Sequence, residues 1–197
     1  GRLFNSAALV TADGQITATY DKRRLVPFGE FAPFRRFLPF VDAIAGPRDF
    51  SAGTGERLFT VPGYGKIALL ICYESIFPGE IGRGGKRPDL IVNITNDAWF
   101  GRTLGPWQHL AQSRMRAVEE GIPMMRVANN GISAGFDSHG RILGQIALDA
   151  VGTIDLSVPS AVTPTIFARY GNAGFFGLLM LVGFLYVRLD QKTPIRQ

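Results

Sequence analysis

The run Lys66-Ile67-Ala68-Leu69-Leu70-Ile71-Cys72-Tyr73-Glu74 decides how this chain folds around its single cysteine. The apolar and partly β-branched residues before Cys72 predict a fully buried strand. The strand ends at Cys72, and the chain turns soon afterwards at Pro78-Gly79. A thiol at the end of a buried strand is held by a rigid scaffold and can face a cleft, where its thiolate can attack a carbonyl. The other interpretation is a small buried hydrophobe, since free cysteine is among the most buried residue types.

The composition indicates one globular domain and argues against several classes of function. The chain has 197 residues, 46% of them hydrophobic, which is enough for a sizeable core. One cysteine excludes an internal disulfide framework. The net charge of +5 comes from lysines and arginines scattered among loops, so we expect no nucleic-acid partner. The two histidines, His109 and His139, lie far apart in the sequence, and we expect neither a metal site nor a cofactor.

Apolar segments separated by turn signals predict a layered α/β domain. Asp13-Gly14 between two strand-like runs indicates a β-hairpin near the start of the chain. Ser138-His139-Gly140 separates two further runs that we expect to pair, and a short helix is expected near residues 34–38. The expected strands span residues 3–10, 15–20, 58–61, 66–71, 89–94, 124–128, 132–137, 141–147 and 152–158.

One long helix is expected at residues 107–120. Pro106 suits its first turn, and Gly121 with Pro123 ends it. Apolar residues recur at helical spacing, which predicts that this stripe packs against the core rather than binding a ligand. The stripe consists of Trp107, Leu110, Ala111, Met115 and Val118.

The C-terminal part of the chain contains a long apolar run. Every residue from 173 to 187 is apolar, glycine or tyrosine, which is slightly short of the roughly 20 residues of a typical spanning helix. We expect a transmembrane helix at residues 166–188 and a cytoplasmic tail at 189–197, with a buried helix of a soluble core as the alternative. Arg188, Lys192 and Arg196 follow the run, while Arg169 alone closely precedes it. The positive-inside rule then places the C-terminus in the cytoplasm and the domain of residues 1–165 on the other side.

A nucleophilic thiol needs a nearby cation or base, because a free thiol with a pKa near 8.5 is only about 3% ionised at neutral pH. Lys22 is the candidate helper, since it ends the second expected strand in Tyr20-Asp21-Lys22, just before an irregular loop. A lysine there can favour the thiolate and stabilise a tetrahedral intermediate. The alternative for Lys22 is a solvated surface charge.

Two carboxylates stand in apolar surroundings. Glu30 lies within Val26-Pro27-Phe28-Gly29-Glu30-Phe31, and Glu74 follows Cys72 by two residues. An unpaired carboxylate costs several kcal/mol to bury, so each is expected to have a cationic or amide partner. Each of them takes part in the site directly, or it forms a structural ion pair that orients a loop.

Two large aromatic residues follow another expected strand. Trp99 and Phe100 lie in Asn96-Asp97-Ala98-Trp99-Phe100-Gly101, on a tight loop next to a strand end. They can pack against a lipid chain, form a pocket wall, or simply pack the loop. Asn129-Asn130-Gly131 is a weaker signal, because paired asparagines before glycine are ordinary turn residues.

These segments form an ordered set of motifs. They run Tyr20-Asp21-Lys22, Leu25-Val26-Pro27-Phe28-Gly29-Glu30-Phe31, Ile71-Cys72-Tyr73-Glu74, Asn96-Asp97-Ala98-Trp99-Phe100-Gly101, Gly105-Pro106-Trp107-Gln108-His109 and Ala128-Asn129-Asn130-Gly131. Together they resemble the carbon–nitrogen hydrolase, or nitrilase, superfamily, and within it the membrane-bound apolipoprotein N-acyltransferases. The resemblance covers nearly the whole chain, including the C-terminal apolar run, and the order of the motifs makes it specific.

The resemblance implies a nitrilase-like αββα sandwich with a Glu–Lys–Cys triad, of which residues 1–165 would form the C-terminal portion. Cys72 would be the nucleophile and Lys22 the triad lysine, with Glu30, Glu74 and Tyr73 as accessory residues near the site. The general-base glutamate of the family precedes the first strand seen here and has no counterpart in this sequence. The family's other membrane helices are also missing, so we expect a fragment that is inactive alone.

The same resemblance implies acyl transfer in two steps. Cys72 would take an acyl chain from a phospholipid as a thioester, and the free amine of a diacylglyceryl-cysteine lipoprotein would then attack it. Trp99, Phe100 and Trp107 would border the acyl pocket. The implied partners are a phospholipid donor, a diacylated apolipoprotein acceptor and the membrane. The implied location is the bacterial inner membrane, with the catalytic domain on the periplasmic face.

Two rival interpretations remain open. A nitrilase or amidase that acts on a small substrate would share Lys22 and Cys72, but it would not need the apolar C-terminal run or the bulky aromatic loops. A non-catalytic membrane-anchored domain would hold Cys72 as inert packing. The reactivity of the thiol and the products formed would separate these interpretations.

Overall fold

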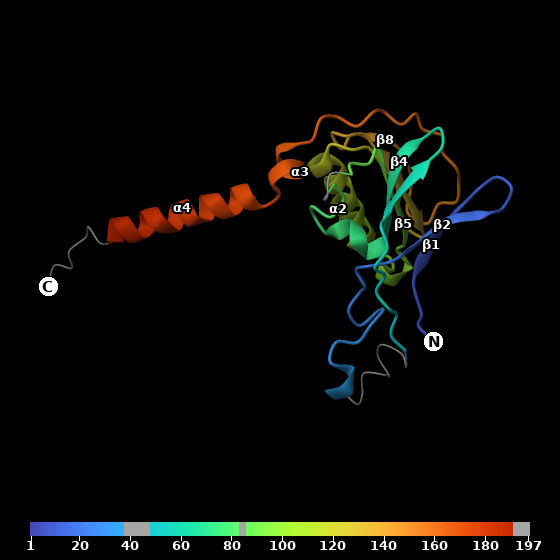
Figure 1. The fold of residues 1–197 in the computed structure, drawn as a ribbon, viewed down its shortest axis with the longest axis horizontal. Helices are drawn as coiled ribbons and strands as arrows, with labels where there is room; N and C mark the ends of the chain where they lie inside the picture. Colours follow the sequence, from blue (N-terminus) through green and yellow to red (C-terminus); the bar gives the residue numbers. More distant parts are fainter. Residues whose placement is uncertain (38–47, 83–85, 191–197) are drawn as a thin grey trace.

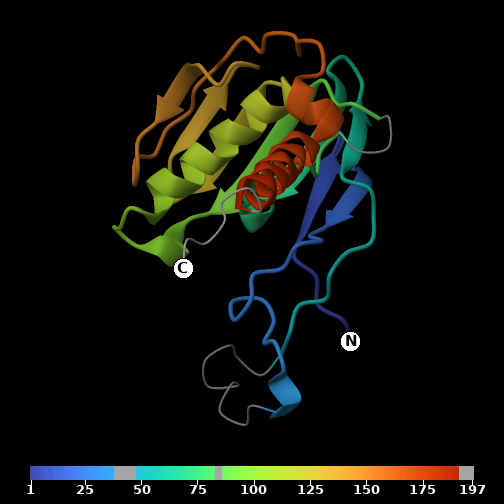
Figure 2. The ribbon, with the colours of Figure 1, turned by 90° about the vertical axis from the view of Figure 1, so that its left-hand side faces the viewer.

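A computed structural model describes residues 1–37, 48–82 and 86–190. The body is a mixed β-sheet with the helix α2 (Gly105–Glu120) against one face, and a separate β-hairpin stands beside the sheet (Figure 1). The segment after this hairpin and the helix α4 (Ala173–Asp190) project from the body in different directions (Figures 1 and 2).

The sheet has six strands in the order β3-β4-β5-β6-β7-β8. β4, β5 and β6 run parallel, and antiparallel strands flank them on both sides. The strands are β3 (Leu58–Val61), β4 (Gly65–Ile71), β5 (Leu90–Asn96), β6 (Met124–Asn129), β7 (Ser133–Phe136) and β8 (Ile142–Ile146). Apart from residues 152–158, the strands expected for this sheet therefore form close to their predicted bounds.

The parallel strands bring the candidate chemistry to one edge of the sheet. Cys72 directly follows β4, Asn96 ends β5 and Asn129 ends β6. The register pairs Ile71 with Ile94 and Asn96 with Asn129, so these three ends lie side by side. Ligands of open α/β sheets bind outside the carboxyl ends of the strands. The motifs that the sequence spreads over many residues therefore meet at this edge.

The predicted hairpin forms from β1 (Ser6–Val10) and β2 (Ile16–Asp21). Gly14 in its turn has a φ of 82°, which glycine adopts without the strain that a β-carbon would cause. The first strand begins later than the predicted residue 3. The short helix expected near residues 34–38 is a 3-10 turn, Arg35–Phe37, and Leu38 lies outside the described residues.

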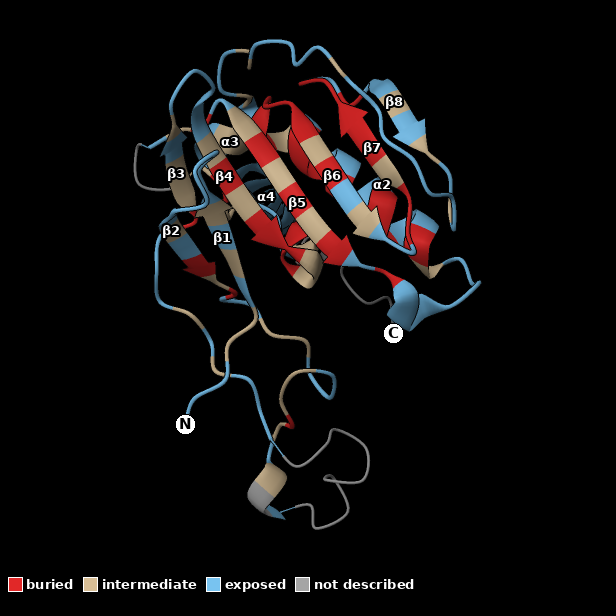
Figure 3. Cartoon of the chain, turned by 90° about the vertical axis from the view of Figure 1, so that its right-hand side faces the viewer, coloured by how far each residue is buried: buried red, intermediate tan, exposed pale blue. Residues whose placement is uncertain are grey.

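The core lies between the sheet and α2. Burial alternates along β4 and β5, as the colours in Figure 3 show, because successive side chains of a strand point to opposite faces. The buried positions form one cluster with Leu110 and Ala117 of α2. The strands contribute Ala68, Leu70, Ile91, Met124, Ala134 and Phe136.

The helix α2 turns a different face to the core from the one expected. Its ends agree with the prediction, with Pro106 in the first turn and Gly121 at the C-cap. Of the predicted apolar stripe, however, only Leu110 is buried, and Trp107 and Met115 are about half exposed. The buried face is mainly polar, because other elements supply hydrogen-bond partners to its side chains. The buried residues are Pro106, His109, Leu110, Ser113, Arg116, Ala117 and Glu120.

The strand predicted at residues 152–158 does not form, and this described segment is irregular. Its side chains lie against the face of the sheet, where Ile154 and Leu156 pack over Gly135 and Gly144 of β7 and β8. A β-carbon at Gly144 would lie 2.5 Å from the Ile154 side chain, so the glycines leave the room that these apolar side chains fill. Contacts of these two side chains with the face of the sheet thus take the place of backbone pairing at its edge.

The structure divides the helix expected at residues 166–188 into two. A short helix, α3 (Ile166–Tyr170), begins after Thr165, whose hydroxyl accepts a hydrogen bond from the Ala168 backbone N–H. Gly171 then breaks the helix with a φ of 55°, and α4 follows.

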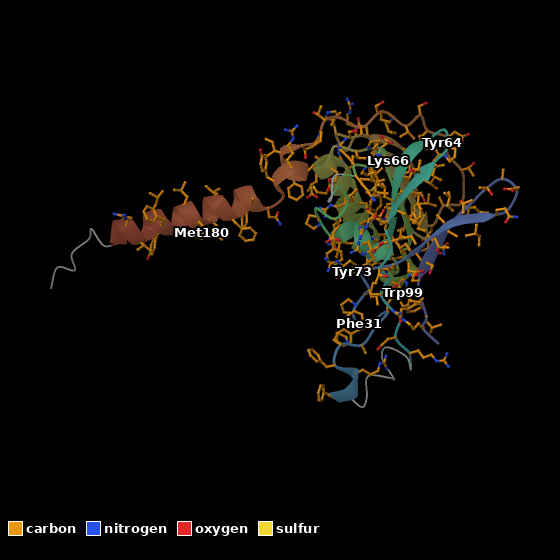
Figure 4. All side chains as sticks on the ribbon, in the orientation of Figure 1. Phe31, Tyr64, Lys66, Tyr73, Trp99 and Met180 are labelled. Atoms are coloured by element: carbon orange, nitrogen blue, oxygen red, sulfur yellow. The ribbon has the colours of Figure 1, made fainter. Side chains whose placement is uncertain are left out.

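The apolar side chains of α4 are exposed, as Met180 illustrates with 76% of its surface accessible (Figure 4). Among the helices of the described ranges, none has the length and apolar character needed to cross a membrane. Residues 191–197 of the expected tail, with Lys192 and Arg196, lie outside the described residues.

Candidate active site

One cavity, with a volume of about 760 Å³, lies outside the carboxyl edge of β4 and β5. Six residues singled out from the sequence line it. They are Lys22, Glu30, Cys72, Tyr73, Trp99 and Phe100. Tyr73 and Trp99 lie at the same end of the body, away from Tyr64 and Lys66 at the β3–β4 hairpin (Figure 4). Residues from motifs that are distant in the sequence thus line one cavity.

Cys72 occupies a strained backbone position at the end of β4. Its φ is 50°, in the left-handed region, which costs a non-glycine residue about 1–3 kcal/mol. A 3-10 turn, η2 (Cys72–Ile76), follows directly, so the strand ends at the cysteine. The side chain is half-buried and lines the cavity, so the thiol is not sealed in the core.

Lys22 directly follows β2 and is 1% exposed, so it is not a solvated surface charge. Its backbone is held on both sides, because its N–H donates to the Asn5 carbonyl and its carbonyl accepts from the Gly53 N–H, both at 2.8 Å. Only glycine fits at position 53, since a β-carbon would overlap the carbonyl oxygen of Asp21. The fold therefore fixes the backbone from which the Lys22 side chain extends.

Glu30 is the partner of the Lys22 ammonium group. Lys22 Nζ lies 2.8 Å from both carboxylate oxygens of Glu30. Asn5 Nδ2 and the Val26 backbone N–H also donate to this carboxylate, each at 2.8 Å. A largely buried ion pair is tolerated when additional hydrogen bonds satisfy it, and these two provide them. The ammonium group is thus held on the cavity wall, where it can stabilise a negatively charged oxygen.

Glu74 lies behind the cavity wall rather than on it, and it is 1% exposed. Its carboxylate accepts hydrogen bonds from the Tyr20 hydroxyl at 2.7 Å and from the Ile71 backbone N–H at 2.9 Å. The backbone N–H groups of Arg23 and Arg24 also donate to it, at 2.9 and 3.2 Å. Glu74 therefore ties the end of β4 to the segment that follows β2, which makes it an organiser of both cavity walls.

Of the aromatic residues that the sequence analysis assigned to the site, three line the cavity and one does not. Trp99 and Phe100 belong to a 3-10 turn, η3 (Ala98–Phe100), and line the cavity, although Trp99 is 80% exposed. Tyr73 lines the cavity next to the nucleophile candidate. Trp107 is half exposed on α2 and is not part of the cavity wall, so its role in a substrate pocket stays a prediction.

A buried polar network that the sequence analysis did not identify extends from the cavity wall, which His109 helps to form, into the interior. His109 of α2 places Nδ1 2.9 Å from Asp97 Oδ1, and Arg126 of β6 places Nη2 2.6 Å from Asp97 Oδ2. Burial alone would raise the pKa of Asp97, but the hydrogen bond from His109 and the charge of Arg126 outweigh it and keep this pKa below its usual value. Asp97 is therefore ionised in the interior of the domain.

Sequence reasoning considered His109 only as a metal ligand and missed this role. A signal was present, since Asp97 and His109 both lie within motifs that carried the family resemblance. Arg126 gave no such signal, because an arginine inside an expected strand does not reveal which partners it meets. The network became visible only once the buried face of α2 was known.

Together the cavity residues supply two of the parts that covalent chemistry at a carbonyl needs, a nucleophile and a positive charge. Cys72 supplies a thiol, and Lys22 supplies a fixed positive charge in the same cavity. Among the described residues of the wall, Glu30 is the only carboxylate, and its hydrogen bonds commit it to holding Lys22.

Comparison with known proteins identifies relatives of the chain. The family model described as carbon–nitrogen hydrolase matches residues 1–166. The apolipoprotein N-acyltransferase of Bradyrhizobium diazoefficiens is 45% identical over 190 residues, which are 95% of this chain and 35% of that protein. The apolipoprotein N-acyltransferase of Rhodopseudomonas palustris is 42% identical over 196 residues, which are 98% of this chain and 36% of that protein.

The chain thus spans about a third of the length of these curated relatives. Among solved structures, it is similar to the carbon–nitrogen hydrolase from Helicobacter pylori G27. The TM-score is 0.54 at 16% sequence identity, over 73% of this chain and 52% of that one. At this identity, the similarity concerns the fold alone.

Proposed function

The chain belongs to the carbon–nitrogen hydrolase family, and from this premise we propose that it is the cysteine-bearing part of an apolipoprotein N-acyltransferase. The sequence relatives support this assignment, since they carry that name and align along almost the whole chain. The observation that carries the proposal is the cavity, because Cys72, Lys22 and bulky aromatic side chains all line it. The complete protein is longer than this chain, so the activity is proposed for the complete protein.

In the first step, the Cys72 thiolate attacks the ester carbonyl of a phospholipid. A carbon–sulfur bond forms, the carbon–oxygen bond of the ester breaks, and the proton of the thiol ends on the departing glycerol oxygen. The Lys22 ammonium group, fixed by Glu30, stabilises the negative charge that develops on the carbonyl oxygen. The products are an acyl thioester and a lysophospholipid.

In the second step, the free α-amine of a diacylglyceryl-cysteine lipoprotein attacks the thioester. An amide forms, the carbon–sulfur bond breaks, and the thiol of Cys72 is regenerated with a proton from the amine. A thioester is a good acyl donor to an amine, and the same ammonium group serves both steps. Both lipid substrates would reach the cavity in turn.

The shape and lining of the cavity support a lipid substrate. Its volume of about 760 Å³ lies in the range of sites that enclose drug-sized ligands. Trp99 and Phe100 offer apolar surface in the same cavity as the thiol, and the high exposure of Trp99 leaves room for a long chain to leave the cavity along it.

The helix α4 supports a membrane location. It has 18 residues, and each of its described large apolar side chains is at least 50% exposed. Exposed apolar surface of this extent marks a contact with lipid or with other apolar helices. In our proposal the exposed apolar surface of α4 contacts the bacterial inner membrane, and the catalytic domain lies on its periplasmic face.

Incubating the complete protein with a phospholipid that carries an isotopically labelled acyl chain tests the proposal. Intact mass spectrometry should detect a labelled acyl adduct on Cys72 that hydroxylamine removes. Addition of a diacylglyceryl-cysteine peptide should discharge the adduct and give a triacylated peptide. The matched variant Cys72→Ala should form neither product.

The rival functions give different results in the same assay. An amidase would release ammonia from small amides and would leave the phospholipid intact. A non-catalytic domain would form no adduct, and its thiol would react with iodoacetamide at the rate of an ordinary cysteine. Either result would overturn the assignment to acyl transfer.

A further inference from the structure

We propose that His109, held by Asp97, is a positioning residue that fixes the backbone of Cys72 in its reactive conformation. The inference rests on the proposed role of Cys72 as the nucleophile. His109 is 3% exposed and borders the cavity, while Asp97, 1% exposed, lies behind it.

The ring of His109 connects the Asp97 carboxylate to the turn that carries the nucleophile. Its Nδ1 lies 2.9 Å from Asp97 Oδ1, and a carboxylate only accepts hydrogen bonds, so Nδ1 carries the proton. Its Nε2 lies 3.2 Å from the carbonyl oxygen of Cys72 and 3.0 Å from Ser75 Oγ. Ser75 Oγ in turn lies 3.2 Å from the same carbonyl oxygen. With the proton on Nδ1, Nε2 is an acceptor and takes its hydrogen bond from Ser75 Oγ, so the imidazole holds the first turn of η2 through Ser75.

A second line of contacts keeps this turn in place from the other side. Ser113 Oγ donates to Ser75 Oγ at 3.0 Å, and Arg126 Nη1 donates to Ser113 Oγ at 2.9 Å. Arg126 also binds Asp97, so one guanidinium group supports both the histidine and the serine. All of these side chains are buried, and in a low-dielectric interior satisfied networks of this kind are rigid.

Asp97 itself is fixed by its surroundings. Thr95 Oγ1 donates to Asp97 Oδ1 at 3.0 Å, and the Asp97 backbone N–H donates to the Asn129 carbonyl at 3.0 Å. A β-carbon at Gly131 would lie 2.5 Å from Asp97 Oδ2, so only glycine leaves space for the carboxylate there. The sequence predicts only an ordinary turn at Asn129-Asn130-Gly131. In the structure this motif accepts the Asp97 N–H and leaves the space that the Asp97 carboxylate occupies.

The strain at Cys72 explains why such a support is needed. A φ of 50° persists in a non-glycine residue only when the surrounding structure over-determines it. Without His109, the peptide after Cys72 can relax toward an ordinary conformation and move the thiol relative to Lys22. A misplacement of about 1 Å can cost roughly 100-fold in rate. In the described part of the chain, the ring nitrogens of His109 contact Asp97, Arg126, Ser75 and the Cys72 carbonyl oxygen, so the residue acts through the turn that carries Cys72.

A pair of amide substitutions tests this role in the complete protein. His109→Gln places an amide near the position of Nε2 and keeps the contact with the Cys72 turn. His109→Asn places its amide near the position of Nδ1 and keeps only the contact with Asp97. We expect His109→Asn to lower the rate of Cys72 acylation at saturating phospholipid about 100-fold, with KM unchanged. We expect His109→Gln to retain most of the rate.

Leu110→Ala provides the matched control for a general loss of stability. Leu110 neighbours His109 on α2 and is buried in the apolar core, outside the network. It should lower the unfolding temperature at least as much as His109→Asn while leaving the rate of acylation close to that of the parent protein.

Two outcomes would overturn the inference. One is an unchanged acylation rate in His109→Asn, and the other is equal slowing in Leu110→Ala or in His109→Gln. Cys72→Ala separates this failure from that of the proposed function. If Cys72→Ala still transfers acyl chains, the function is wrong, whereas an inactive Cys72→Ala with a fully active His109→Asn contradicts only the positioning role.

Discussion

Glu30 and Glu74 mark two regions that look alike in the sequence and differ in the structure. Both are carboxylates in apolar surroundings, and both bind groups that belong to the segment after β2. Glu30 faces the cavity and holds the side-chain ammonium group of Lys22. Glu74 lies behind the wall and holds mainly backbone N–H groups.

The difference shows that the partner of a buried carboxylate decides its role. A carboxylate that fixes a side-chain charge on the cavity wall affects the reaction, because the charge acts on the substrate. A carboxylate that accepts several backbone hydrogen bonds affects the fold, because its removal leaves those donors without their charged partner. Substitutions at Glu74 should therefore act first on stability, and substitutions at Glu30 should act first on rate.

The largest effect is expected for Glu74→Ala. The substitution removes the acceptor of four hydrogen bonds, from Tyr20, Arg23, Arg24 and Ile71. Leaving buried groups without their charged partner should lower the free energy of unfolding by about 3–5 kcal/mol. Denaturant unfolding of the complete protein, followed by tryptophan fluorescence, measures this loss.

Glu56→Ala is the matched control for this prediction. Glu56 pairs with Lys86 at 2.9 Å, but the two side chains are 71% and 62% exposed. A surface pair of this kind contributes about 0–1 kcal/mol. Equal destabilisation by the two substitutions would contradict the role that we assign to Glu74.

The next effect is expected for Glu30→Gln. The amide keeps the size of the side chain but removes the charge that holds the Lys22 ammonium group at 2.8 Å. We expect the rate of Cys72 acylation to fall about 100-fold, as when a transition-state donor is lost, with a smaller loss of stability than in Glu74→Ala. Single-turnover acylation and denaturant unfolding together provide the measurement.

Asp49→Asn tests whether any ion pair near the cavity has this effect. Asp49 pairs with Arg35 at 2.7 Å in a partly exposed position and does not line the main cavity. It should leave the acylation rate near that of the parent protein. The comparison between the two regions fails if Glu30→Gln keeps its rate and instead unfolds as readily as Glu74→Ala.

The sequence predicted much of this arrangement because the informative patterns were local. The apolar run before Cys72 forms β4, the family is confirmed, and Lys22 and Glu30 line the same cavity as the cysteine. The sequence could not predict the different roles of Glu30 and Glu74, because these depend on which hydrogen-bond donors surround each carboxylate. Those donors come from segments that lie far away along the chain.

The face of α2 shows the same limit more clearly. Apolar periodicity predicted that Met115 would face the core, whereas His109 and Ser113 are buried instead. A helix buries polar side chains only where other elements provide partners, and here Asp97 and Arg126 provide them. Hydrophobic periodicity contains no information about such partners, so the prediction was wrong at the place where the site is built.

The smallest effect is expected for Tyr20→Phe, and it sharpens the comparison because it removes one donor from the Glu74 region. The Tyr20 hydroxyl donates to Glu74 at 2.7 Å, so its loss should cost about 1 kcal/mol at neutral pH. Burial, reinforced by the hydrogen bond to Glu74, raises the pKa of Tyr20 far above its usual value. The folded state therefore favours the protonated phenol, and this stabilisation is complete below about pH 10 and declines above it, where the unfolded chain ionises.

Unfolding midpoints from pH 8 to pH 11 should fall less steeply for Tyr20→Phe than for the parent protein. Tyr64→Phe, at a position that is 75% exposed, should follow the parent curve. Parallel curves for all three proteins would mean that the phenol of Tyr20 is not sealed behind the cavity wall, and the division between the two carboxylate regions would lose its physical basis.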